Sequence, residues 1–209
     1  MQLKKRQLVA LISTTPLIAA CQVINGRPTS AFVDEGFRFH GVGLVLVTDA
    51  VPGSEMRGVE LYADQSSTPF YTSSVLALRN REIMSYPGGN IPRDVRALWR
   101  DNSTIIRRPE GGGNTYAGRV LGDYSTKVSD RIPDELLREI RANGGSLRLK
   151  FRLTPDALLF GWDIERAAGG VSRFEMAGGD FREAKVFNGK IIEQGWYIDK
   201  NGRKILTDG

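Results

Sequence analysis

The sequence predicts a mainly β protein: an antiparallel β-sandwich or a curved sheet of about ten short strands that carries one helix. Short segments of alternating or continuously apolar residues recur along most of the chain. Turn-forming pairs such as Pro52-Gly53 and Asn188-Gly189 separate these segments. Only Pro133 to Ala142 combines helical apolar spacing with the end residues of a helix.

The strands expected in the first half differ in how their apolar residues are arranged. Val42 to Val47 is nearly all apolar, which is typical of a strand buried on both faces. Val95 to Trp99 has apolar residues at alternate positions. Short runs rich in Val, Thr and aromatic residues predict the remaining strands, at Val59 to Tyr62, Phe70 to Leu78 and Thr115 to Tyr124.

The predicted helix has consistent features at both ends. Pro133 occupies the first turn and is followed by Asp134 and Glu135, which favour a helix N-terminus. The apolar face consists of Leu136, Leu137 and Ile140, and Asn143-Gly144-Gly145 ends the helix.

The last third of the chain is again predicted to be β. Leu147 to Leu153 alternates apolar residues with Arg148, Lys150 and Arg152, which indicates a half-buried strand with a cationic outer face. Asn188-Gly189 and Asn201-Gly202 both predict tight hairpin turns of type I′. The other expected strands are Ala157 to Ile164, Phe174 to Met176, Lys185 to Phe187, Ile191 to Gln194, Trp196 to Ile198 and Arg203 to Ile205.

The N-terminal segment has the pattern of a secretory signal peptide. Lys4, Lys5 and Arg6 precede a mostly apolar run from Leu8 to Ala20. A membrane helix needs roughly 20 apolar residues, so this run is too short to span a bilayer. We therefore expect residues 1–20 to be a leader, residues 21–35 to be a tether and residues 36–209 to form a single β-rich domain.

Ile18-Ala19-Ala20-Cys21 resembles the lipobox of bacterial lipoproteins. The resemblance implies cleavage before Cys21 and attachment of a diacylglycerol and a further acyl chain to this cysteine. Several acyl chains anchor a protein durably, whereas one chain anchors it only marginally. Gln22 in place of Asp implies, by the rule of that family, the outer membrane of a Gram-negative bacterium, with the protein facing the periplasm. The alternative is an ordinary signal peptide followed by an incidental Cys21.

Charge and composition exclude several classes of function. The leader holds three of the 29 basic residues and none of the 24 acidic ones, so the mature chain carries a net charge of only +2. No basic tract with interleaved aromatic residues is present, which argues against a nucleic-acid partner. Cys21 is the only cysteine, so no disulfide is expected.

The sequence offers few residues for catalysis. His40 is the only histidine, and its alternation with Phe37 and Phe39 predicts a strand residue rather than a catalytic one. One histidine cannot seed a zinc site, and no cofactor motif is found. Ser125-Thr126-Lys127 could suggest a catalytic serine–lysine pair, but such combinations are common in sequences, and we interpret this one as coincidental. We therefore expect a non-enzymatic protein without metal or cofactor.

The carboxylates of Asp163 and Glu165 are candidates for a catalytic pair. Asp163 and Glu165 would lie about 7 Å apart on one face of a strand, a spacing that also suits paired catalytic acids. Arg148, Arg152 and Arg166 nearby favour cross-strand ion pairs instead.

Aromatic and cationic residues are the candidates for partner binding, because both types dominate binding hot spots. At least one of the three tryptophans is expected outside the core. The loops Pro87 to Asn90 and Pro109 to Asn114 are further candidates, since loops on a rigid β scaffold often carry function. The predicted partner-binding residues are Trp99, Arg107, Arg108, Asn114, Trp196 and Tyr197.

The middle of the chain resembles a domain of unknown function found in small proteobacterial lipoproteins. The resemblance rests on Ile91-Pro92-Arg93-Asp94-Val95-Arg96-Ala97-Leu98-Trp99-Arg100, on Thr115-Tyr116, on Ile132-Pro133-Asp134-Glu135-Leu136-Leu137 and on a strand near Leu147 to Phe151. Asp134 stands where Glu is common in the family, and a long Gly-rich loop follows Arg108. Members often neighbour effectors of the type VI secretion system, and some are thought to be immunity proteins against phospholipase toxins.

The resemblance implies a lipid-anchored periplasmic protein that binds another protein, as an immunity factor against a secreted toxin. A structural lipoprotein of the envelope or of a secretion apparatus is the main alternative. A periplasmic hydrolase or sugar-binding protein is a third possibility, which a pocket holding His40 beside Ser125 or Asp163 would support.

Overall fold

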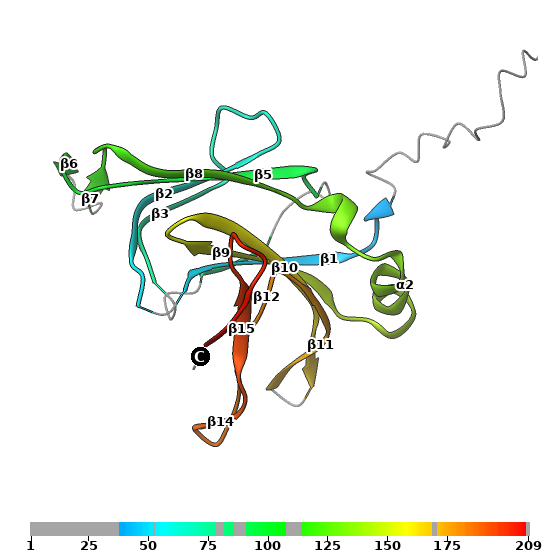
Figure 1. Cartoon of the computed structure of the whole chain (residues 1–209). Helices are drawn as coiled ribbons and strands as arrows, with labels where there is room; N and C mark the ends of the chain where they lie inside the picture. The colour runs from blue at the N-terminus through cyan, green and yellow to red at the C-terminus, as the bar shows by residue number, and fades with distance from the viewer. Residues whose placement is uncertain are drawn as a thin grey trace, which may run out of the picture. The chain divides into compact units, whose positions relative to one another are not determined.

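The computed structural model describes residues 38–51, 53–77, 82–85, 91–107, 114–168 and 171–207. All of them fall within Asp34–Gly209, which forms one unit. The expected signal peptide, Cys21 and the tether lie outside the described residues, as do Arg108 and the loop from Pro87 to Asn90. Mainly β structure with one α-helix, as the sequence predicts, is confirmed (Figure 1).

A five-stranded sheet lies at the centre of the fold. Its strands follow the order β11 (Val171–Gly179), β10 (Ala157–Ala168), β9 (Ser146–Thr154), β1 (Gly43–Ala50) and β4 (Glu82–Ser85). The pair β1 and β9 is parallel, with Leu46 opposite Leu149, whereas the other pairs are antiparallel. The expectation of a purely antiparallel sheet is therefore wrong at this pair. The second sheet and the helix separate β1 from β9 in sequence, and a connection this long permits a parallel return.

A second, four-stranded antiparallel sheet packs on one face of the first. Its order is β3 (Tyr71–Leu76), β2 (Met56–Ala63), β5 (Asp94–Arg100) and β8 (Val120–Lys127). One apolar core joins the two sheets and includes Leu46, Leu61, Val95, Phe151 and Phe160, all nearly inaccessible to solvent. The two sheets thus form the sandwich that the sequence predicts.

The helix α2 (Asp134–Asn143) follows a short 3-10 turn, η1 (Ser129–Arg131), and matches the predicted segment to within one residue. Leu136, Leu137 and Ile140 are buried in the common core. Gly144 follows the helix at φ +76° and donates its N–H to the Ile140 carbonyl, which ends the helix as expected.

His40 lies in an exposed turn before β1, so its assignment to a strand is wrong. The neighbouring Arg38 guanidinium donates to the Asp134 carboxylate at 2.8 Å and to the Ser129 carbonyl at 2.8 Å. These contacts hold the segment against the start of α2, where it has no strand partner among the described residues.

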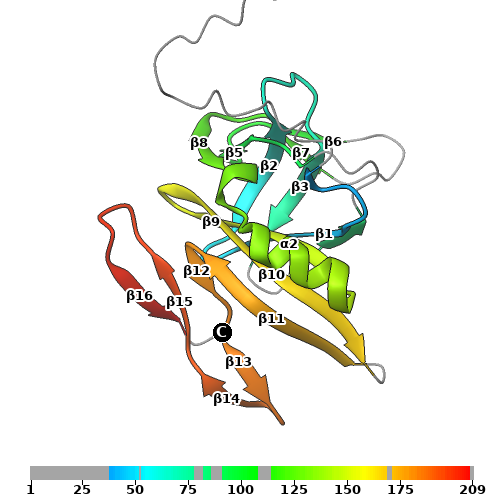
Figure 2. The same cartoon turned by 90° about the vertical axis from the view of Figure 1, so that its right-hand side faces the viewer.

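The C-terminal segment, residues 181–207, forms two further units. One is the sheet β12 (Phe181–Arg182), β15 (Gly195–Ile198) and β16 (Lys204–Thr207), and the other is the hairpin β13 (Lys185–Phe187) and β14 (Lys190–Glu193). Figure 2 shows both beside β11. A third hairpin, β6 (Ile105–Arg107) and β7 (Asn114–Tyr116), extends from the second sheet.

The two predicted hairpin turns differ in geometry. Asn188 and Gly189 both have positive φ, +49° and +74°, so the type I′ prediction is confirmed there. At Asn201-Gly202 only Gly202 has a positive φ, and the Gly202 N–H donates to the Asp199 carbonyl. The type I′ prediction is wrong at this site because Asp199 nucleates a longer loop: its carboxylate accepts the N–H groups of Asn201 and Arg203.

We predict that Gly122→Ala destabilises the fold. A Cβ at this position would lie 2.0 Å from the Trp99 ring, so the core would be overpacked. Overpacking typically costs about 1–3 kcal/mol. Urea unfolding measures the loss, with the exposed Ser125→Ala on the same strand as a control expected to change stability by less than about 0.5 kcal/mol. Equal effects of the two substitutions would contradict the packing described here.

Candidate functional site

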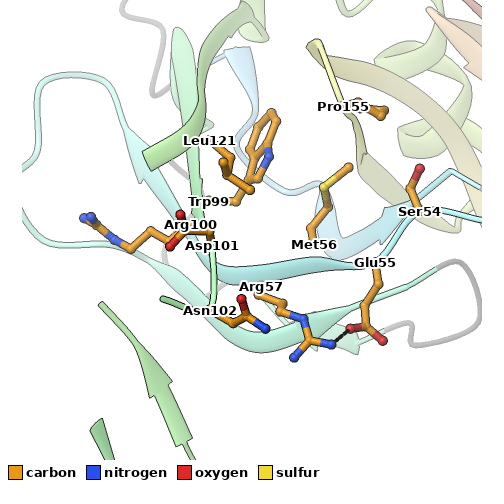
Figure 3. Close-up of a pocket in the computed structure, with 10 residues that line it drawn as sticks. All are labelled: Ser54, Glu55, Met56, Arg57, Trp99, Arg100, Asp101, Asn102, Leu121 and Pro155. Carbon is orange, nitrogen blue, oxygen red and sulfur yellow. Dashed lines mark ion pairs between the residues drawn. The ribbon is translucent and has the colours of Figure 1, made fainter. Parts of the chain in front are cut away.

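The candidate site is a cleft of about 390 Å³ at one end of the second sheet (Figure 3). Met56, Trp99, Leu121 and Pro155 supply its apolar lining. They come from β2, β5, β8 and the turn between β9 and β10, so elements of both sheets form the cleft. Concave apolar surfaces with a few placed polar groups are the usual form of a binding site.

Trp99 lies at the inner side of this cleft. Its side chain is only 2% exposed, and its ring lies over Gly122 and stacks on Tyr124 with 5.4 Å between ring centroids. Trp99 is therefore a core residue rather than the exposed anchor that the sequence analysis considered. Its burial follows from the alternation of β5, which points Val95, Ala97 and Trp99 into the core.

Within the described residues, no hydrogen bond of the Trp99 indole N–H is present. Trp99 lines the cleft, and its ring lies beside Met56 there (Figure 3). Buried tryptophan N–H groups usually have a hydrogen-bond partner. The cleft thus combines an apolar lining with the indole N–H of Trp99 and with the polar side chains of Arg100 and Asn102.

Charged residues of both signs form the rim of the cleft. Arg57 pairs with Glu55, donates to the Tyr116 hydroxyl at 3.2 Å and lies over the Tyr116 ring. Asp101 accepts hydrogen bonds from the Ser103 side chain and backbone, which lower the pKa of its carboxyl group. The rim therefore offers both an arginine and a fixed carboxylate to a ligand.

The second notable feature is the cationic face of β9, which is buried rather than exposed to solvent. Arg148, Lys150 and Arg152 are 2–3% exposed, so the prediction of a solvent-facing cationic surface is wrong. Phe181 covers two of them: its ring lies 4.5 Å from the Arg152 guanidinium carbon and 5.2 Å from Lys150 Nζ. The Phe174 ring lies 3.7 Å from the guanidinium carbon of Arg148.

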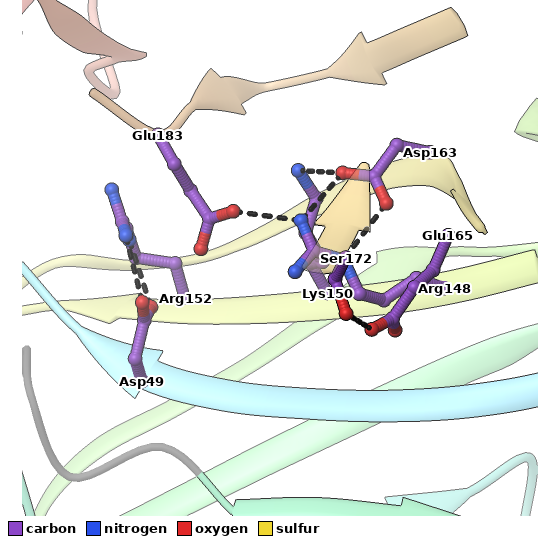
Figure 4. A network of polar contacts seen from close by, with 8 residues as sticks. All are labelled: Asp49, Arg148, Lys150, Arg152, Asp163, Glu165, Ser172 and Glu183. Carbon is purple, nitrogen blue, oxygen red and sulfur yellow. Dashed lines mark hydrogen bonds and ion pairs between the residues drawn. The ribbon is translucent and has the colours of Figure 1, made fainter. Parts of the chain in front are cut away.

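Three carboxylates neutralise this buried face (Figure 4). Arg152 forms a two-point ion pair with Asp49 at 2.7 and 2.8 Å. Arg148 pairs in the same way with Asp163, which also accepts from Lys150 Nζ at 2.8 Å. Arg148 additionally reaches Glu183 in the C-terminal segment at 2.8 Å. The ion pairing expected for Asp163 is thus present, whereas Glu165 accepts from the Ser172 hydroxyl instead.

The pKa values of this cluster follow from burial and pairing. Burial raises the pKa of Asp163, but the hydrogen bond from Arg148 and the charge of Lys150 outweigh it, so the pKa lies below its ordinary value. Burial lowers the pKa of Lys150, and nearby Asp163 only partly opposes this shift. Each of these groups has an ion-pair partner, and the pair of Arg148 with Glu183 attaches the C-terminal segment to the central sheet.

The predicted partner-binding residues do not come together. Arg107 and Asn114 are exposed and pair across the β6–β7 hairpin. Trp196 and Tyr197 are half-buried on β15, where Trp196 lies 4.8 Å from Lys204 Nζ. Only Trp99 belongs to the cleft, and Arg108 lies outside the described residues.

Among the described residues, those considered for catalysis do not come together in one site. His40 lines a cavity with Arg38, Asp134, Leu137, Arg138 and Arg141, and neither Ser125 nor Asp163 lines it. Lys127 pairs with Asp94 at 2.8 Å, which raises the pKa of its ammonium group, the opposite of what a general base requires. Within the described ranges no cluster of three metal-ligating side chains is present.

A large apolar surface on the C-terminal segment was not identified from the sequence. Val186, Phe187, Ile191 and Ile192 of the β13–β14 hairpin are 43–64% exposed. Their consecutive apolar pairs are visible in the sequence, but such pairs in short strands usually indicate burial.

The described residues define the protein as a mainly β sandwich with an apolar cleft. No family model, curated protein or solved structure matches the chain. No helix in the described part of the chain is long and apolar enough to cross a membrane.

We predict that Asp163→Asn strongly destabilises the fold, because Arg148 and Lys150 lose a shared buried carboxylate. Breaking a buried pair costs about 3–5 kcal/mol. The control is Asp123→Asn, which breaks the exposed pair with Arg96 and should cost at most about 1 kcal/mol. Urea unfolding at neutral pH compares the two, and a smaller loss for Asp163→Asn than for the control would contradict this assignment.

The decrease of the free energy of unfolding at acidic pH should also depend on Asp163. Its folded pKa is depressed, so its contribution is present above the unfolded pKa, near 3.9, and is lost as the pH falls through the lower folded value. We expect the free energy of unfolding of the wild type to decrease below about pH 4 more steeply than that of Asp163→Asn. Parallel curves for the two proteins would show that Asp163 does not titrate as described.

Proposed function

We propose that this chain is a lipid-anchored periplasmic protein that acts by binding another protein, as an immunity factor that neutralises a secreted toxin by covering it. The support for the anchor is the basic start, the apolar run to Ala20 and Cys21 at the position a lipobox requires. A protein held by acyl chains stays at the bilayer surface.

The cleft at Trp99 is the observation that carries the binding role. An apolar side chain of a partner, followed by a backbone carbonyl, matches the apolar lining and the indole N–H of Trp99, which has no partner within the described residues. Arginine is among the residues most enriched in binding hot spots, and here Arg57 lines the cleft. The ion pair of Arg57 with Glu55 holds that rim in place.

Occlusion at a membrane fits the toxin class implied by the family resemblance. A phospholipase toxin works at the lipid surface, where a tethered inhibitor has a high effective concentration. Binding through a cleft requires no reactive centre, which agrees with the engaged state of Lys127 and with the exposed turn that carries His40.

We predict that Trp99→Phe weakens partner binding roughly two- to tenfold. Phenylalanine keeps an aromatic ring but removes Nε1–H, and one hydrogen bond contributes about 0.5–1.5 kcal/mol, where 1.4 kcal/mol is tenfold. Leu121→Ser, at a 54% exposed position in the cleft, is a second variant with little effect on folding. The measurement is titration against any toxin found to be encoded beside this gene, together with rescue of cells that express such a toxin in the periplasm.

Trp162→Phe is the matched control, because it removes a half-buried indole outside the cleft and should bind like the wild type. The proposal fails if the wild type neither binds nor rescues from any neighbouring toxin. Stable co-purification with secretion-apparatus subunits, unaffected by Trp99→Phe and Leu121→Ser, would support the structural alternative instead.

A further inference from the structure

The β13–β14 hairpin exposes apolar side chains in a way that the cleft does not explain. Phe187 is 64% exposed, Ile192 60%, Val186 57% and Ile191 43%. The hairpin forms a two-stranded sheet of its own and projects from the rest of the C-terminal segment (Figure 1). An isolated two-stranded hairpin is only marginally stable in water, so an external surface would be expected to support it.

The apolar residues occupy both faces of this hairpin. Val186 lies opposite Ile191, and directly opposed residues of an antiparallel pair share a face. Phe187 follows Val186 in the strand and therefore points to the other face. Docking on a flat protein surface would cover only one face, whereas entry into an apolar medium covers both.

Positive charge surrounds these apolar residues. Lys185 and Lys190 are exposed at the two ends of the hairpin. Lys185 lies opposite Glu193, but Glu193 forms its ion pair with Arg182, and no ion pair of either lysine is present within the described residues. Residues 181–207 hold six basic and three acidic residues in all. Lysine is depleted at protein–protein interfaces. At a membrane its ammonium group can extend to the lipid phosphates while its stem stays among apolar groups.

We propose that the β13–β14 hairpin inserts into the surface of an anionic lipid bilayer. Its apolar side chains enter the headgroup and acyl boundary, and Lys185 and Lys190 contact the phosphates. Trp196 and Tyr197, half-buried on the neighbouring strand β15, are residue types enriched at membrane–water interfaces. The inference rests on the proposed lipid anchor, which brings the domain to the bilayer and orients it there together with the hairpin.

A fluorescence experiment on the full acylated chain tests this insertion. The thiol of Cys21 is blocked in the acylated protein, so Ile192→Cys provides a single site for an environment-sensitive fluorophore. Ile106→Cys in the β6–β7 hairpin, also an exposed apolar position at 53%, is the matched control. The protein is reconstituted in phosphatidylethanolamine vesicles with and without phosphatidylglycerol, and quenching by brominated lipid is measured.

We expect lipid quenching at position 192, increased by phosphatidylglycerol, and none at position 106. Lys185→Glu with Lys190→Glu should reduce the inserted fraction roughly tenfold or more and remove the phosphatidylglycerol dependence. Phe187→Ser should weaken insertion without changing flotation of the anchored protein.

Flotation separates the two possible failures. If the protein floats with the vesicles but position 192 stays in water, the insertion is disproved and the hairpin is left as a surface for a protein partner. If the protein does not float at all, the proposed lipid anchor fails, and the insertion fails with it.

Discussion

The structure depends on the neutralisation of three buried cations on one strand. β9 presents Leu147, Leu149, Phe151 and Leu153 to the apolar core and Arg148, Lys150 and Arg152 to the opposite face. Buried charges are tolerated only when they are paired and hydrogen-bonded. Asp49 on β1 and Asp163 on β10 supply the pairing within the sheet, and Glu183 supplies it from the C-terminal segment. The cluster therefore joins the first strand, the central strand and the last part of the chain.

This arrangement explains what sequence reasoning could and could not establish. The alternation in β9 correctly predicts a strand, but it contains no information about what covers the charged face. Arginine and lysine are seldom fully buried, so the solvent-facing interpretation was the reasonable one. The covering residues Phe174 and Phe181 lie more than twenty positions further along the chain. The parallel pairing of β1 with β9 joins residues much further apart in the chain, such as Gly43 and Ser146.

The candidate site, too, can be predicted from the sequence only in part. Trp99 can be identified from the sequence by residue type, and the strand alternation around it predicts burial. That Met56, Leu121 and Pro155 come together beside it in one cleft depends on the packing of two sheets. The turn geometry can be predicted at Asn188-Gly189 but not at Asn201-Gly202, because the Asp199 carboxylate accepts backbone hydrogen bonds within the second loop. His40 was misassigned because Arg38 fixes a short segment to α2.

The functional account requires that acyl chains hold a binding domain at a bilayer, where its cleft and its C-terminal hairpin can act together. Mass spectrometry of the N-terminal peptide of the protein purified from envelopes tests this most directly. The account predicts a peptide that begins at Cys21 and carries a diacylglycerol and a further acyl chain. A mature chain that begins elsewhere, or that has a free Cys21 thiol, would contradict it.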